Sequence, residues 1–273
     1  DGKALQAGTS HFLGQNFSKS SEIKFQNRDG ENEYAWTTSW GVSTRLIGGM
    51  IMTHADDDGM IMPPRLSPQH IVIIPHIRDE QNQDIIISYC ENLIKDLSKL
   101  NYKDRKLEII LDQRDLKIGE KTWNWIKKGI PIRFEIGMRE IRDNTIFISR
   151  RDNGDKSSIG YQEALDSILD ILDNIQSSMY NKAYKFRDNH SVEIDNYEDF
   201  KNFFTTKRKD HSEITGGFAW AHFCGDLDWE KRINEDLGVT LRLIPFNTNP
   251  CNNEKCIFSG KKSVGRVLFS KSY

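Results

Sequence analysis

The stretch Met62-Pro63-Pro64-Arg65-Leu66-Ser67-Pro68 divides the 273-residue chain into two parts with different sequence patterns. Each of its three prolines fixes φ and lacks a backbone donor, so neither a helix nor an inner strand can cross the stretch. We therefore expect a stiff connector and a domain boundary. Residues 70–74, which follow directly, form an apolar run of the length that is typical of a buried strand.

Beyond that first strand, strand patterns alternate with helical patterns. Further apolar strands are expected at residues 107–111, 131–136 and 145–149. Strands separated by helices predict an α/β layer domain with a largely buried sheet. The helix before the second strand carries its apolar residues on one face, and these are Ile86, Tyr89, Cys90, Leu93, Ile94 and Leu97. Cys90 is therefore expected in the core.

A longer helical pattern begins at Gly160 and leads into a region of short mixed elements at about 185–273. Its apolar stripe consists of Tyr161, Ala164, Leu165, Ile168, Ile171, Leu172, Ile175 and Met179. The spacing predicts one long helix that packs along a single face.

On the N-terminal side of the connector, Thr38-Ser39-Trp40-Gly41-Val42-Ser43-Thr44-Arg45-Leu46-Ile47-Gly48-Gly49 joins an apolar strand to a helix. Helical spacing of the apolar residues continues to about residue 54. The guanidinium of Arg45 lies at the junction, where it could stack on a planar base or clamp a phosphate. The twelve residues alone leave open whether Arg45 binds a ligand or simply faces solvent.

The run Asp56-Asp57-Asp58-Gly59 is expected to end that helix and to expose three carboxylates. A divalent cation could bind there, but consecutive aspartates at a helix end favour a solvated turn.

Composition limits the class of protein. The net charge is −2, so no strong overall field indicates a nucleic-acid partner, although residues 103–152 hold 13 Lys/Arg against 9 Asp/Glu. No apolar run approaches the roughly 20 residues of a membrane span, and no signal peptide is visible. Four cysteines do not resemble a secreted disulfide framework, which favours a reducing, cytoplasmic compartment. Because the chain begins at Asp1 inside a motif, we expect an N-terminal part to be missing.

Three blocks of the sequence, in order, resemble class II aminoacyl-tRNA synthetases in their prolyl-tRNA synthetase form. Thr38–Gly49 resembles motif 3, and Gln6-Ala7-Gly8-Thr9-Ser10-His11-Phe12-Leu13-Gly14-Gln15-Asn16-Phe17-Ser18-Lys19 resembles the active-site loop and its following helix. Val267-Leu268-Phe269-Ser270-Lys271-Ser272-Tyr273 resembles the tyrosine-ended tail of the archaeal and eukaryotic type. In that type the terminal tyrosine turns back towards the active site, although Tyr273 could equally be an ordinary chain end.

The resemblance implies an α/β fold in three parts. Residues 1–62 correspond to the C-terminal part of an antiparallel-sheet catalytic domain, including motif 3. Residues 69–160 correspond to an α/β anticodon-binding domain with a mixed sheet. Residues 161–273 correspond to a small α+β domain that resembles a zinc-binding domain and is preceded by the long helix.

The resemblance also implies an activity. The family uses ATP and Mg²⁺ to activate L-proline as prolyl-adenylate, transfers the prolyl group to the terminal ribose of tRNA(Pro), and acts as a homodimer. Such chemistry needs cations and positioning donors rather than a protein nucleophile. Motifs 1 and 2 are not found, so we expect this chain alone to be inactive. One alternative is a non-catalytic tRNA-binding module. A second alternative is another class IIa synthetase, which would not explain the tyrosine-ended tail.

Candidate site residues follow from the matched motifs. Arg45 matches the catalytic motif 3 arginine, which packs on adenine and reaches the γ-phosphate. The resemblance implies ATP binding by Gln6, Thr9, Ser43 and Arg45. It implies proline binding by His11, Ser39, Trp40 and Gly41, with the Trp40 indole as a flat apolar wall.

The anticodon-binding resemblance rests on Ile110-Leu111-Asp112-Gln113-Arg114-Asp115, Gly119-Glu120-Lys121 and Trp125. Asp112, Arg114 and Lys121 offer one acceptor and two cationic donors, which suit the edges of guanine bases. An ordinary exposed charge cluster is the alternative. Arg150, Arg151 and Lys156 flank a turn and could touch the phosphate backbone, although surface basicity explains them equally well.

The zinc site of the resembling domain looks degenerate. Cys224 and Cys256 match ligand positions, but Trp229 and Ser259 stand where further cysteines are expected. Even with Cys251 the chain offers three thiolates, whereas a closed structural zinc site needs four ligands. His222 has no usual ligand spacing. We therefore expect no zinc and reduced, structural cysteines.

Overall fold

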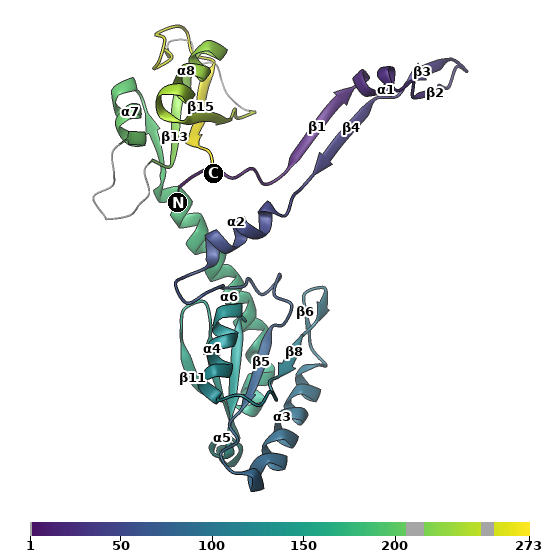
Figure 1. Cartoon of the computed structure of the whole chain (residues 1–273), viewed down its shortest axis with the longest axis vertical. Helices are drawn as coiled ribbons and strands as arrows, with labels where there is room; N and C mark the ends of the chain where they lie inside the picture. Colours follow the sequence, from purple (N-terminus) through teal and green to yellow (C-terminus); the bar gives the residue numbers. More distant parts are fainter. Residues whose placement is uncertain (1, 206–215, 247–253) are drawn as a thin grey trace. The chain divides into compact units, whose positions relative to one another are not determined.

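The computed structural model describes residues 2–205, 216–246 and 254–273. The chain divides into two compact units, of which one is Met50–Tyr184 and the other joins Asp1–Gly49 to Lys185–Tyr273 (Figure 1). The connector at residues 62–68 contains neither helix nor strand, as predicted. The division between units, however, falls earlier in the sequence than the expected domain boundary, because residues 56–68 pack on the Met50–Tyr184 unit.

The Met50–Tyr184 unit is built on a five-stranded sheet in the order β11-β10-β9-β5-β8. Strand β5 (Ile71–Pro75) runs parallel to β8 (Ile109–Leu111) and β9 (Ile132–Ile136). Strands β10 (Thr145–Arg150) and β11 (Lys156–Gly160) continue it in antiparallel fashion. The mixed sheet and four of its strands confirm the prediction, and β11 is additional.

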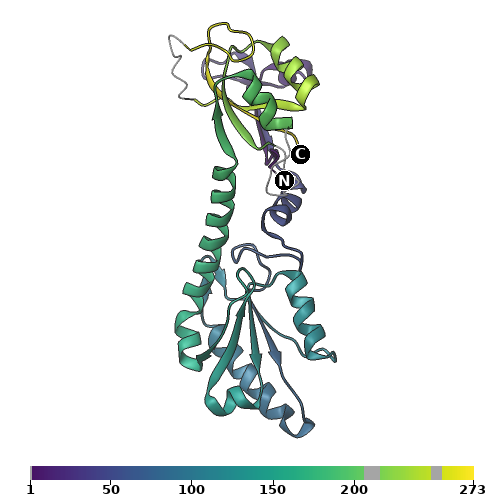
Figure 2. The same cartoon turned by 90° about the vertical axis from the view of Figure 1, so that its left-hand side faces the viewer.

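Alternation along β5 explains how helices cover both faces of this sheet. Ile71 and Ile73 pack into a core with α3 (Gln83–Leu97) and α6 (Tyr161–Asn189). Val72 and Ile74 face α4 (Ile118–Lys128), where Trp125 packs. Figure 2 shows α4 and α6 on opposite sides of the sheet. Every β5 residue is buried, so side chains on both faces of the strand stabilise the fold. Burial of each large aliphatic side chain contributes roughly 1.5–3 kcal/mol to the free energy of folding.

The predicted helical stripes are confirmed. Ile86, Cys90, Leu93 and Leu97 are the buried residues of α3. The 29-residue α6 buries Ala164, Ile168, Leu172, Ile175 and Met179. A short 3-10 helix (Glu80–Asn82) precedes α3, α5 (Met138–Asp143) follows β9, and β6 (Asn101–Tyr102) and β7 (Arg105–Lys106) form a hairpin.

Long-range polar contacts hold residues 56–68 on this unit. The Asp56 carboxylate pairs with the Arg151 guanidinium at 2.8 Å between Oδ2 and Nη1. The Met60 amide donates to the Lys127 carbonyl at 3.0 Å. The expectation that the Asp56–Gly59 turn is merely solvated is therefore wrong for Asp56, since its partner lies 95 residues away in sequence.

The other unit contains a four-stranded mixed sheet in the order β12-β13-β15-β14. Its strands are β12 (Ser191–Ile194), β13 (Phe218–Phe223), β14 (Val239–Leu243) and β15 (Gly265–Lys271), and its helices are α7 (Tyr197–Thr205) and α8 (Leu227–Leu237). Aromatic rings fill the core, with Phe200, Phe223 and Phe258 all packed against Phe269. The described part of residues 185–273 thus combines a mixed four-stranded sheet with two helices.

The N-terminal segment of this unit forms two small antiparallel pairs. Strand β1 (Thr9–Gly14) pairs with β4 (Thr37–Gly41), and β2 (Lys24–Gln26) pairs with β3 (Asn32–Tyr34). Helix α1 (Asn16–Ser20) follows β1, and α2 (Arg45–His54) follows β4. Ahead of β1, Ala4 pairs in parallel with Ser272, and the Ala4 amide donates to the Lys271 carbonyl at 2.9 Å.

Candidate functional site

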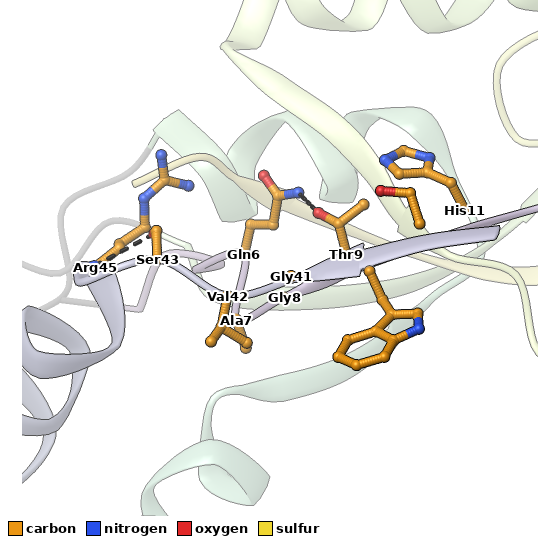
Figure 3. Close-up of a pocket in the computed structure, with 11 residues that line it drawn as sticks. Gln6, Ala7, Gly8, Thr9, His11, Gly41, Val42, Ser43 and Arg45 are labelled. Atoms are coloured by element: carbon orange, nitrogen blue, oxygen red, sulfur yellow. Dashed lines mark hydrogen bonds between the residues drawn. The ribbon is translucent and has the colours of Figure 1, made fainter. Parts of the chain in front are cut away.

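A pocket of about 360 Å³ opens on the β1–β4 pair (Figure 3). The structure brings together all the residues for which the sequence predicts ATP or proline binding, although they lie in two segments far apart in sequence. The lining consists of Gln6, Ala7, Gly8, Thr9, His11, Ser39, Trp40, Gly41, Val42, Ser43 and Arg45.

Strand register decides which side chains share a face of the pair. Thr9 lies opposite Gly41, and His11 lies opposite Ser39. Successive side chains alternate between faces, so Thr9, His11 and Ser39 point to the same side. Figure 3 shows Gln6, Thr9, His11 and Arg45 on one side of the ribbon and Val42 on the other.

Trp40 occupies a different position from the one expected of a proline-pocket wall. It lies opposite Ser10, between the register pairs that contain His11 and Thr9, so its side chain lies on the opposite face. The indole is 79% exposed. On the same face, Phe12 is 73% exposed, and its ring stacks on Trp36 with centroids 5.6 Å apart. This face of the hairpin is therefore an exposed apolar surface.

The polar side of the pocket carries neutral hydrogen-bonding groups and one guanidinium. The Gln6 side-chain amide donates to Thr9 Oγ1 at 2.8 Å, which orients both groups. The Ser43 hydroxyl accepts from the Arg45 amide at 3.3 Å as α2 begins. Among the described residues no carboxylate lines the pocket, and Arg45 places its guanidinium at the N-terminal end of α2.

A second cluster lies where β8 ends. The Asp112 carboxylate, 2% exposed, accepts from Arg114 Nε at 2.8 Å, from Arg114 Nη2 at 2.7 Å and from Trp125 Nε1 at 2.7 Å. Burial alone would raise the pKa of Asp112, but the hydrogen bonds from Arg114 and Trp125 lower it to about 2. Asp112 is thus an ionised, buried anchor for the guanidinium.

The three predicted anticodon residues therefore differ in their accessibility. Lys121 is buried, and its ammonium donates to the Asp112 carbonyl at 3.1 Å. Arg114 remains the exposed member, with its guanidinium 5.7 Å from the centre of the Trp125 ring. The hydrogen bond from Trp125 to Asp112 was not predicted from the sequence. The i+4 spacing of Trp125 from Lys121, which places both side chains on one helix face, was the available signal.

Arg150 and Arg151 are not free surface cations, which corrects one prediction. Arg150 bonds Asp152 Oδ1 at 3.0 Å and Asp152 Oδ2 at 2.8 Å. Arg151 is buried and holds Asp56, as described above. Of the three cations expected to flank this turn, Lys156 alone is exposed.

The degenerate zinc positions lie together in the C-terminal region. The Ser259 hydroxyl donates to Cys224 Sγ at 3.4 Å, and Cys256 is buried in the adjoining core. Cys251 lies outside the described residues. Among the residues that are described, no group of three or more His, Cys, Asp or Glu side chains could hold a metal ion. Two sulfurs with a serine and a tryptophan do not fit a closed tetrahedral zinc site.

Comparison with known families agrees with this geometry. Residues 70–171 match the family model for the anticodon binding domain, and residues 209–273 match the model for the C-terminal domain of prolyl-tRNA synthetase. The mixed sheet and these matches define the class as the anticodon-binding part of an aminoacyl-tRNA synthetase.

Curated relatives named proline–tRNA ligase match the whole chain. The protein named proline–tRNA ligase 2 of Anaeromyxobacter dehalogenans (strain 2CP-C) is 47% identical over 279 residues, which cover 100% of this chain and 54% of that protein. The ligase of Rhodopirellula baltica is 43% identical, with coverage of 100% and 53%. The chain belongs to the prolyl-tRNA synthetase family and corresponds to its C-terminal region. It spans about half the length of the curated relatives it matches.

No helix in the described ranges is both long and apolar enough to span a bilayer.

Proposed function

We propose that this chain serves a prolyl-tRNA synthetase in two ways. It supplies one wall of the pocket in which L-proline and ATP react, and it supplies the domain that binds the anticodon of tRNA(Pro). The main support is a pocket of about 360 Å³ lined by the residues for which the motifs predict ATP or proline binding, although the Trp40 side chain lies on the opposite face of the strand pair. The family match over the whole chain supports the choice of proline.

Within the pocket, charge and position suggest separate roles. Arg45 would stack on adenine and neutralise a phosphate, since its guanidinium is planar and cationic. Gln6, Thr9 and Ser43 would position the nucleotide through neutral hydrogen bonds. His11, Ser39 and Gly41 would line the proline end. Trp40, whose indole lies on the opposite face, is not assigned to the proline end.

The reaction joins the proline carboxylate to the α-phosphate of ATP and releases pyrophosphate. Negative charge spreads over the phosphate oxygens, so catalysis depends on alignment and on cations. Mg²⁺, when bound, neutralises part of that charge as a Lewis acid. Among the described residues no carboxylate lines this pocket, so these residues do not by themselves offer a Mg²⁺ site. The residues described here would hold the nucleotide and exclude alternative orientations.

The nucleotide role is tested with Arg45→Ala in a complete enzyme that carries this sequence. We expect the KM for ATP to rise by at least about tenfold in proline-dependent ATP–pyrophosphate exchange, which corresponds to about 1.4 kcal/mol of lost binding. Arg28→Ala is the matched control, because Arg28 is an exposed arginine of the same segment outside the pocket. Equal KM values for ATP in the two variants would refute the assignment of Arg45.

The anticodon role is tested separately. Arg114→Ala should weaken tRNA(Pro) binding by about 1–3 kcal/mol, since the exposed guanidinium is the group placed to contact a base. The control is Lys106→Ala, which removes an exposed cation from β7 of the same unit. Filter binding at one fixed salt concentration measures both. Identical affinities for the two variants would exclude a specific contact by Arg114.

Activity of the chain by itself distinguishes the two leading functions. We expect no proline-dependent exchange from the purified 273-residue chain, because one wall cannot align two reactants. Exchange by the chain alone would overturn the proposal that half the site lies elsewhere. A complete protein that binds tRNA(Pro) yet shows no exchange would favour the non-catalytic module.

A further inference from the structure

Two thiols and a hydroxyl meet at the end of β13, outside the pocket and the anticodon-side cluster. Cys224 directly follows β13, and its sulfur accepts the Ser259 hydroxyl at 3.4 Å. Cys256 lies three residues before Ser259, and its thiol is within hydrogen-bonding reach of both Ser259 and Cys224. Cys224 is half-buried and packs against the core cluster that contains Cys256.

Backbone hydrogen bonds fix this arrangement. The Ile257 amide donates to the His222 carbonyl at 3.1 Å, and the Val264 amide donates to the Phe223 carbonyl at 2.8 Å. Within the loop, the Cys256 amide donates to the Lys261 carbonyl at 2.8 Å. These hydrogen bonds hold the segment that carries Cys256 against the strand that leads into Cys224. The backbone therefore fixes the relative position of the two cysteines.

Access separates the described cysteines, because Cys224 is half-buried whereas Cys90 and Cys256 are buried. Cys90 is a contrast within the same chain, because complete burial raises the pKa of its thiol to about 12. Thiolate character and access decide which cysteines oxidise.

We propose that Cys224 and Cys256 form a redox-active pair that hydrogen peroxide converts to an intramolecular disulfide. The half-buried Cys224 sulfur attacks a peroxide oxygen, the O–O bond breaks, and hydroxide leaves with the thiol proton as water. The resulting sulfenic acid is attacked by the Cys256 sulfur, the S–O bond breaks, and a second water leaves. In balance, two thiols and one H₂O₂ give one disulfide and two waters.

The test uses the full chain with Cys251→Ser, so that the cysteine outside the described residues cannot contribute. After limited treatment with hydrogen peroxide, we expect a mass lower by about 2 Da and one cross-linked peptide that joins Cys224 to Cys256. Dithiothreitol should restore both thiols. Cys90 should remain free and should alkylate in the untreated chain at least about tenfold more slowly than Cys224.

Single variants make the outcome decisive. Cys256→Ser should trap a sulfenic acid on Cys224 that dimedone labels, whereas Cys90→Ser should form the disulfide like its parent. Circular dichroism checks that each variant is folded. A parent chain that gains oxygen without losing two hydrogens overturns the proposal, as does a Cys90 that oxidises as readily as Cys224.

Discussion

His70 provides the sharpest test of how the connector is held. Its imidazole is completely buried, and both of its ring nitrogens face N–H donors. Nδ1 accepts the Glu108 amide at 2.9 Å, and Nε2 lies 2.9 Å from Arg105 Nη2. Arg105 also donates to the Pro64 and Ser67 carbonyls of the connector. With Nδ1 as the acceptor, a further proton on His70 would set Nδ1–H against the Glu108 amide and would place a second positive charge beside the Arg105 guanidinium.

Burial and the Arg105 charge accordingly lower the pKa of His70 from 6.5 to about 4. The unfolded chain therefore takes up a proton near pH 6.5 that the folded chain refuses until about pH 4. Stability is full above the unfolded-state pKa and falls as the pH drops through this window. A difference of roughly 2.5 pKa units corresponds to about 3 kcal/mol of unfolding free energy lost between about pH 7 and about pH 4.

The perturbation is His70→Asn, which keeps an acceptor for the Glu108 amide but cannot titrate. Urea unfolding followed by far-UV circular dichroism gives the free energy of unfolding of the Met50–Tyr184 unit at both pH values. The wild-type chain should lose about 3 kcal/mol more than the variant on acidification. His11→Asn, at an exposed histidine, should behave as wild type. Equal acid losses in the wild-type chain and His70→Asn would refute the reasoning.

Three further changes test other contacts in the same unit. Asp112→Asn removes the charge that strengthens the hydrogen bonds from Arg114 and Trp125 and should cost about 1.5–3 kcal/mol in urea unfolding; a change below about 1 kcal/mol would contradict the anchor role. Gly129→Ala should destabilise by about 2 kcal/mol in the same assay, because Gly129 has φ of +72° and an added Cβ would overlap the Met60 carbonyl. Gly119→Ala, with open space around it in α4, should instead be neutral or stabilise by up to about 1 kcal/mol, and a loss there would show that the helix reasoning is wrong.

Local sequence pattern predicted the buried elements well. Helices cover both faces of the sheet, so β5 is apolar at consecutive positions. This unbroken apolar run can be recognised in the sequence. The stripe of α6 is equally plain. Strand β11 escaped prediction because its first residues, Lys156, Ser157 and Ser158, are polar and exposed. Edge strands of this kind carry little periodic signal.

Contacts between distant segments could not be predicted in the same way. Nothing near Asp56 identifies Arg151 as its partner, and nothing near Arg105 identifies the connector carbonyls. The side on which Trp40 lies depends on strand register, where a shift of one residue exchanges the two faces. Helix α2 shows a further limit. Its apolar spacing predicted a helix correctly, yet none of its residues is buried.

The pairing of Ala4 with Ser272 also bears on the order in which the protein is made. Strands of the Met50–Tyr184 unit lie within one continuous stretch, so a ribosome has delivered all of that unit once Tyr184 emerges. The other unit is split, and the Ala4 contact closes a loop of more than 260 residues. Contacts of such high sequence separation form slowly, and domains generally fold as they are synthesised. The pairing of Ala4 with Ser272 can therefore form only after Ser272 has been synthesised, whereas the Met50–Tyr184 unit, which contains the residues that match the anticodon binding domain, can fold earlier.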